Sequence, residues 1–151
     1  MIKNEEIVEE LNDLVKINND RIMGYEKAIE ANEDAQLDDL FRHYVVQSQK
    51  FRSQLAEHIV RIDGRAVTDA TSTDISSKIH RAWIDIKSAV TGKDRDTVLS
   101  SVEFGENMAV AAYASAIEKD HIPAHIKEDL STQLSELKAA HDKMAALKGD
   151  K

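Results

Sequence analysis

Apolar residues recur at helical spacing along four long stretches of the chain. The stretches at about 4–31, 36–63, 94–119 and 123–147 carry apolar side chains at i, i+3, i+4 and i+7, the pattern of a helix with one buried face. In the first stretch these positions are Ile7, Leu11, Leu14, Val15, Ile22, Tyr25 and Ile29. We therefore expect four long amphipathic helices that share one core.

The connections between these stretches predict the topology. Short connections join the first two helices, at 32–35, and the last two, just before Pro123, so each pair is expected to form an antiparallel hairpin. A long connection separates the hairpins; it contains a loop at 64–73 and a shorter helix at about 75–90. A crossover of this length makes the second and third long helices parallel. The sequence therefore predicts an all-α, ferritin-like four-helix bundle, with Trp83 of the crossover helix covering an open side.

Composition and charge narrow the class of protein. A length of 151 residues fits one domain, 1–151, and the high charged fraction with 5 Gly and 1 Pro is typical of long amphipathic helices. The absence of cysteine excludes thiolate chemistry and cysteine metal sites. The net charge of −8 argues against a nucleic-acid partner. An acidic N-terminal segment and the lack of a long apolar run predict a cytoplasmic protein without membrane insertion.

Several polar residues fall within the apolar faces of the predicted helices. Glu106 lies near the middle of the third helix's face, and Glu103 lies near its edge. Folding the hairpins about their turns places Asn18 beside Ser48 and Glu103 close to His141. Parallel helices that start level also match Ser48 with Glu106. We therefore expect one polar layer in the middle of the bundle, formed by Asn18, Gln47, Ser48, Glu103, Glu106 and His141.

This layer has two interpretations. The first is a site for iron, manganese or zinc, with Glu103, Glu106 and His141 as ligands and a further oxygen from Gln47 or Asn18. The second is a hydrogen-bonded network that fixes the register of the helices, each polar group satisfied by another.

A complete di-metal site requires more acid than this chain offers. Such sites take Glu-x-x-His from two helices and Glu from the other two. Here the second helix has Gln47-x-x-Lys50, and Lys138 lies three residues before His141. Two carboxylate positions are therefore neutral or cationic, which leaves less negative charge to hold two divalent ions.

Three segments carry a family resemblance: LNDLVKINNDRIMGYEKAIE, HRAWIDIKSAVTGKDRDTVLSSVEFGENMAVAAY, and the closing Gln133…His141-Asp142. Over about 10–147 the chain resembles a bacterial family of four-helix-bundle proteins, catalogued as domain of unknown function 2383 and grouped with ferritin-like folds. The resemblance implies a ferritin-like fold and a bacterial, intracellular protein, with no assigned activity.

The resemblance also implies candidate site residues. On the matching positions these are Glu103, Glu106, Gln133 and His141. Relatives often carry an acid near Ile22 or Met23, where this chain is apolar, so the first helix would lack one ligand.

Two functional hypotheses follow, and no residue is assigned a catalytic role. The leading one is a ferritin-like protein of unassigned role, with a link to stress as one option, that has at most an incomplete carboxylate and histidine metal site in mid-bundle. If that site binds iron, the iron would be oxidised by oxygen or peroxide. The alternative is a non-catalytic interaction or scaffold bundle whose polar layer fixes register. In that case the apolar Val46 and Phe104, outside the stripes, mark a surface for a homodimer or another protein partner. A DNA-protecting ferritin relative is disfavoured by the negative charge.

Overall fold

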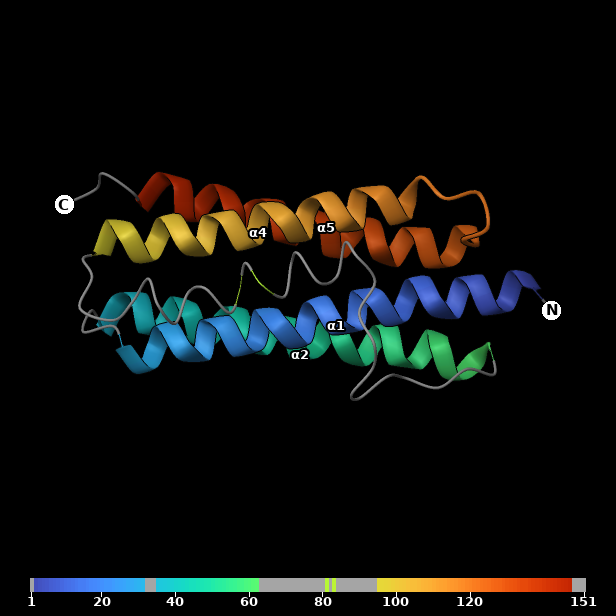
Figure 1. The fold of residues 1–151 in the computed structure, drawn as a ribbon, viewed down its shortest axis with the longest axis horizontal. Coiled ribbons are helices and arrows are strands. Elements are labelled where there is room, and N and C mark those ends of the chain that lie inside the picture. The colour runs from blue at the N-terminus through green and yellow to red at the C-terminus, as the bar shows by residue number, and fades with distance from the viewer. Residues whose placement is uncertain (1, 32–34, 63–80, 82, 84–94, 148–151) are drawn as a thin grey trace.

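The computed structural model describes residues 2–31, 35–62, 81, 83 and 95–147. These residues form four long helices, α1 (Ile2–Ala31), α2 (Ala35–Arg61), α4 (Arg95–Ile117) and α5 (Ala124–Leu147). The helices lie side by side in an elongated bundle (Figure 1). The predicted all-helical four-helix bundle is confirmed, and the helix ends differ from the expected ones by at most two residues, within the ordinary uncertainty of helix boundaries.

The directions of the helices match the expected topology. α1 and α2 run in opposite directions, as do α4 and α5, whereas α2 and α4 begin at the same end of the bundle (Figure 1). α1 contacts α2 and α4, and α5 contacts α4 and α2, so the four helices enclose one core. The predicted loop at 64–73 lies outside the described residues. So does the crossover helix at 75–90, except for Arg81 and Trp83, which are both helical.

The predicted apolar stripes form the core. Side chains from every helix are buried, because each helix turns its stripe inward and leaves most of its charged residues outside. The largest fully buried aliphatic and aromatic side chains include Leu11, Leu14, Ile17, Tyr25, Phe41, Phe51, Leu55, Ile59, Trp83 and Tyr113. The bundle therefore needs no disulfide or metal to account for its core.

Trp83 packs directly against the bundle. Its side chain is 0% exposed, and its ring centroid lies 5.4 Å from that of Tyr25 on α1. On α4 the indole lies over Gly105, where an added Cβ would come within 2.8 Å of an indole carbon. The expectation that Trp83 covers the bundle is confirmed, and the close approach depends on a glycine at position 105.

Candidate functional site

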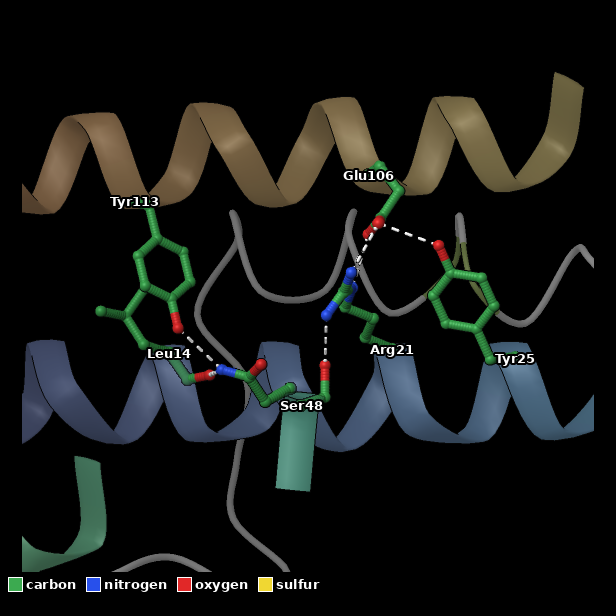
Figure 2. A network of polar contacts seen from close by, with 7 residues as sticks. Leu14, Arg21, Tyr25, Ser48, Glu106 and Tyr113 are labelled. Atoms are coloured by element: carbon green, nitrogen blue, oxygen red, sulfur yellow. Dashed lines mark hydrogen bonds and ion pairs between the residues drawn. The ribbon is translucent and has the colours of Figure 1, made fainter. Parts of the chain in front are cut away.

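A buried ion pair lies in the middle of the bundle. Arg21 on α1 and Glu106 on α4 are both 0% exposed. The guanidinium binds the carboxylate through two bonds, Nε to Oε1 at 2.6 Å and Nη2 to Oε2 at 2.7 Å. Parallel bonds of this kind are the strongest geometry that an arginine and a carboxylate adopt. The pair therefore ties α1 to α4 at one fixed height (Figure 2).

The remaining polar atoms of this pair also have partners. Arg21 Nη1 donates to Ser48 Oγ on α2 at 2.8 Å, and the Tyr25 hydroxyl donates to Glu106 Oε2 at 2.9 Å. The guanidinium carbon lies 5.4 Å from the ring centroid of Tyr25 and 5.3 Å from that of Tyr44, within the range of cation–π attraction. We call Arg21, Tyr25, Ser48 and Glu106 the ion-pair layer. It joins three helices and contains one full positive and one full negative charge.

The electrostatics of the ion-pair layer favour the charged form of Arg21. Burial alone would lower the pKa of Arg21, but the Glu106 carboxylate and its hydrogen bond outweigh this effect, so the pKa lies above its ordinary value. Burial raises the pKa of Tyr25 well above its ordinary value, and the nearby Glu106 charge raises it further. The phenol is therefore kept neutral, as a donor to the carboxylate.

A second set of polar side chains lies about one turn along α1 and two turns along α4 from the ion-pair layer. Asn18 Nδ2 donates to the Leu14 carbonyl at 2.9 Å and to the Tyr113 hydroxyl at 2.8 Å. The Tyr113 hydroxyl donates in turn to Gln133 Oε1 at 2.6 Å, and Gln133 Nε2 donates to Gln54 Oε1 at 3.0 Å. We call Asn18, Gln54, Tyr113 and Gln133 the amide layer. It takes one side chain from each of the four helices, so it restricts their relative sliding.

The buried tyrosines predict a loss of stability at alkaline pH. Burial raises the pKa of Tyr25 and of Tyr113, so each phenol ionises more readily in the unfolded chain than in the folded one. Their contribution to stability is complete below the unfolded pKa and is lost as the pH rises above it. We expect these two residues to lower the free energy of unfolding by about 2 kcal/mol between pH ~8 and pH ~10.5.

This alkaline effect is measured by following phenolate absorbance and far-ultraviolet circular dichroism in the same titration. Phenolate is expected to form together with loss of helix, with a smaller contribution from Tyr44, whose pKa burial also raises. Full phenolate absorbance in a chain that is still helical would contradict the buried positions of Tyr25 and Tyr113.

The structure separates the polar layer that the sequence predicts. Ser48 and Glu106 meet at matching height, as expected, but through Arg21 rather than directly. Asn18 bonds to Tyr113 of the amide layer, which continues to Gln133. The polar residues that were expected in one layer therefore belong to the ion-pair layer and the amide layer, which are about one turn apart along α1.

The other predicted ligands lie at the edges of the bundle. His141 Nε2 is 3.5 Å from Glu103 Oε2, so the expected proximity of these two residues is confirmed. Their side chains are 28% and 21% exposed, and His141 Nδ1 also lies 3.2 Å from Asp142. Gln47 is half-buried, and its Oε1 has no hydrogen-bond partner among the described residues. The four predicted metal ligands are therefore not drawn together around one point by the described contacts.

The residues as placed do not fit a di-metal centre. Both oxygens of Glu106 bind Arg21, so a divalent cation there would face a guanidinium of like charge. Within the described part of the chain, no group of three or more His, Asp or Glu side chains is arranged to hold a metal ion. Iron, manganese or zinc at Glu103, Glu106, His141 and Gln47 stays a prediction that these contacts do not favour.

Sequence reasoning missed Arg21, the central residue of the ion-pair layer. The sequence does indicate that Arg21 faces the core, because it lies seven residues after Leu14 and four before Tyr25, on the buried face of α1. Gln54 of the amide layer lay outside the expected set as well. Tyr113 lies on the buried face of α4, and its hydroxyl is the part that joins the amide layer.

In the described residues, no helix is long and apolar enough to cross a membrane.

Comparison with known proteins supports the family resemblance. No curated protein and no solved structure matches the chain. A family model described as Domain of unknown function (DUF2383) matches residues 6–119, which include most of α1, all of α2 and α4, and the whole ion-pair layer. This match covers well over half of the sequence, and the chain therefore belongs to the DUF2383 family.

Proposed function

We propose that this chain is a non-catalytic interaction or scaffold bundle whose buried polar layers fix the register of its helices. The observation that carries the proposal is the Arg21–Glu106 ion pair, with both side chains 0% exposed. A protein cation satisfies the central carboxylate, in a position where a metalloprotein of this architecture would need that carboxylate for its metal.

The chemistry of the ion-pair layer supports a structural role. Arginine cannot act as a base at ordinary pH, and the Tyr25 phenol is held neutral. Ser48 Oγ accepts a hydrogen bond from a cation, which makes it a weaker nucleophile. Because Glu106 is fully buried, a substrate has no direct access to its carboxylate. Each group is thus arranged to satisfy a neighbour rather than to react.

The arrangement of partners also supports a role in helix register. The ion-pair layer joins α1, α2 and α4, and the amide layer joins all four helices. A helix that slid by one residue would move about 1.5 Å along its axis and rotate these side chains out of reach. Polar layers of this kind specify one packing among several that an apolar core would allow.

A second candidate function is favoured by one contact. The separation of 3.5 Å between His141 Nε2 and Glu103 Oε2 would allow both to bind one metal ion at the half-buried edge between α4 and α5. A metal bound there would have fewer protein ligands than a complete di-metal centre, as the ferritin-like, stress-related hypothesis requires. It would take its further ligands from water or from other residues.

Metal content distinguishes the two candidates. We expect protein purified without chelator or tag to hold iron, manganese and zinc far below one ion per chain, and to take up little added ferrous iron. The Glu103→Ala, His141→Ala variant is expected to behave identically. A matched control, His125→Ala, Glu136→Ala, removes the same residue types from exposed positions of α5. Stoichiometric metal that the first variant loses and the control retains would overturn the scaffold proposal.

A further inference from the structure

We propose that a second copy of this chain docks on the outer face of α4, in a symmetric dimer centred near Asn107. This inference rests on the proposed function, since it names the partner of an interaction bundle. It starts from Phe104, an aromatic side chain on α4 that is 56% exposed. We call Phe104, Asn107 and Ala111, which are all exposed on one side of α4, the α4 face.

The three residues of the α4 face carry no charge, and the nearest charged side chain of α4 that reaches solvent is the partly exposed Glu103, four residues before Asn107. From Phe104 to Ile117 the single charged residue in the sequence is Glu106, and Glu106 is buried in its pair with Arg21. A solvent-facing helix surface normally carries charged residues throughout. The described outer faces of the other helices do so. Exposed charged residues include Glu5, Glu9, Glu26 and Glu30 on α1, Arg42, Lys50, Glu57 and Arg61 on α2, and Glu128, Glu136, Lys138 and Lys143 on α5.

The net charge limits where a second copy can approach. Each chain carries a net charge of −8, so two copies repel one another when their acidic surfaces approach. That repulsion is weakest where the approaching surfaces carry no charge. The α4 face therefore offers the least unfavourable route by which this chain meets a copy of itself, and it offers an apolar side chain to bury on contact.

The spacing of the α4 face is self-complementary. Phe104 and Ala111 are seven residues apart, so they lie on the same side of the helix. If two α4 helices pack antiparallel about an axis between Asn107 and Met108, the Phe104 ring of each copy meets the small Ala111 of its partner. The large phenylalanine ring then fills the space over the small alanine, and the two-fold symmetry makes this contact occur once on each side of the axis. Asn107 lies next to the axis, where its amide can donate to and accept from the same amide of the second copy.

The other exposed apolar residues are less suited to a partner. Val46 and Val60 on α2 are 62% and 66% exposed, and they lie fourteen residues apart on the same outer face. Exposed charged side chains occupy that face between and beside them, among them Lys50 and Glu57. Isolated valines in charged surroundings are ordinary for a protein surface. They provide a matched control for Phe104.

The size of the interface predicts a weak dimer. One pair of crossing helices buries less surface than the roughly 1,600 Å² of a standard stable interface. The dissociation constant is therefore expected in the micromolar range, with a monomer at high dilution. Sedimentation velocity over a series of concentrations measures this equilibrium in the intact chain.

Two glutamate variants test the position of the interface. Phe104→Glu places a charge on the α4 face and removes the aromatic anchor from both copies, so we expect it to weaken dimerisation by at least about 30-fold. Val46→Glu adds the same charge at a similarly exposed position on α2 and is expected to leave the equilibrium unchanged. Both sites are largely exposed, and circular dichroism checks that each variant stays helical.

Cross-linking tests the symmetry independently. The chain has no cysteine, so a single introduced thiol can form a disulfide only between copies. Asn107→Cys, next to the proposed axis, is expected to form a dimer under mild oxidation at least about 10-fold faster than Val60→Cys on α2. Equal rates for the two variants would overturn the proposed axis.

The outcomes separate this inference from the proposed function. A concentration-dependent dimer that Phe104→Glu weakens and Val46→Glu preserves supports docking at the α4 face. A monomer at every concentration overturns it, as does a dimer that only Val46→Glu weakens. Neither of these results bears on metal content, so a metal-free monomer would remove the second copy as partner and leave the scaffold proposal intact. Metal-loaded protein would overturn the scaffold proposal whatever its oligomeric state.

Discussion

Replacing Glu106 by glutamine is expected to lower the free energy of unfolding by about 3–5 kcal/mol. The substitution removes the negative charge that balances Arg21 and leaves a guanidinium that is 0% exposed without a counter-ion. Water cannot reach the cation unless the bundle opens. Urea unfolding followed by circular dichroism measures the change. If the dependence of the free energy of unfolding on urea concentration is the same in both proteins, the native state of the variant is still compact.

Removing both charges should cost much less than removing one. In the Arg21→Met, Glu106→Gln variant no ion is buried, and the glutamine oxygen can still accept the hydrogen bond of the Tyr25 hydroxyl. We expect the double variant to regain most of the stability that Glu106→Gln loses, because buried ion pairs contribute little beyond the cost of burying their charges.

An exposed ion pair provides the control. Arg42 and Asp39 on α2 lie 3.2 Å apart with side chains 59% and 84% exposed. Asp39→Asn is expected to change the free energy of unfolding by less than about 1 kcal/mol. If Glu106→Gln had an effect as small as this control, the ion-pair layer would not be buried as described.

The architecture was predictable because it depends on features repeated many times along the sequence. Four long apolar stripes at helical spacing determine four helices, and short connections force neighbouring helices to be antiparallel. An error of one or two residues at a helix end changes neither the number of helices nor their directions. Trp83 could also be placed in outline, since a large apolar side chain on a crossover has to cover the core somewhere.

The ion-pair layer was predictable only in part. Glu106 and Ser48 were identified because a short or acidic side chain within an apolar stripe demands an explanation. The sequence does not by itself mark Arg21 as buried, because a long charged side chain on a helix usually reaches solvent while its aliphatic part covers apolar surface. Once Glu106 is buried, however, it needs a cation, and an arginine on the buried face of α1 is the residue that supplies one.

The heights of the side chains were harder to predict than their faces. Folding the hairpins located Asn18 near Ser48, and in the structure Arg21 is the hydrogen-bond partner of Ser48 while Asn18 bonds to Tyr113. Three residues along a helix amount to about 4.5 Å, so a small error in register decides which side chains touch. For Glu103 and His141 the expected height is right, and it is their distance from the bundle axis that differs from the expectation. They do meet, but at the edge of the bundle.

Replacing Trp83 by alanine is expected to destabilise the fold by about 3–5 kcal/mol, because it leaves a cavity over Gly105 and removes an aromatic contact with Tyr25. Gly105→Ala is expected to cost about 1–3 kcal/mol through the clash of its Cβ with the indole. This loss is informative because alanine in a helix is otherwise favoured over glycine by about 1 kcal/mol. Urea unfolding measures both.

The combination of these two substitutions tests the contact itself. Without the indole the Cβ at position 105 meets no tryptophan carbon, so in the Trp83→Ala background Gly105→Ala should be neutral or should stabilise α4 by up to about 1 kcal/mol. The same substitution thus changes from harmful to harmless according to the residue at position 83. Additive effects would show that the indole lies elsewhere. A coupling of at least about 1 kcal/mol would confirm that the indole of Trp83 packs against Gly105 of α4.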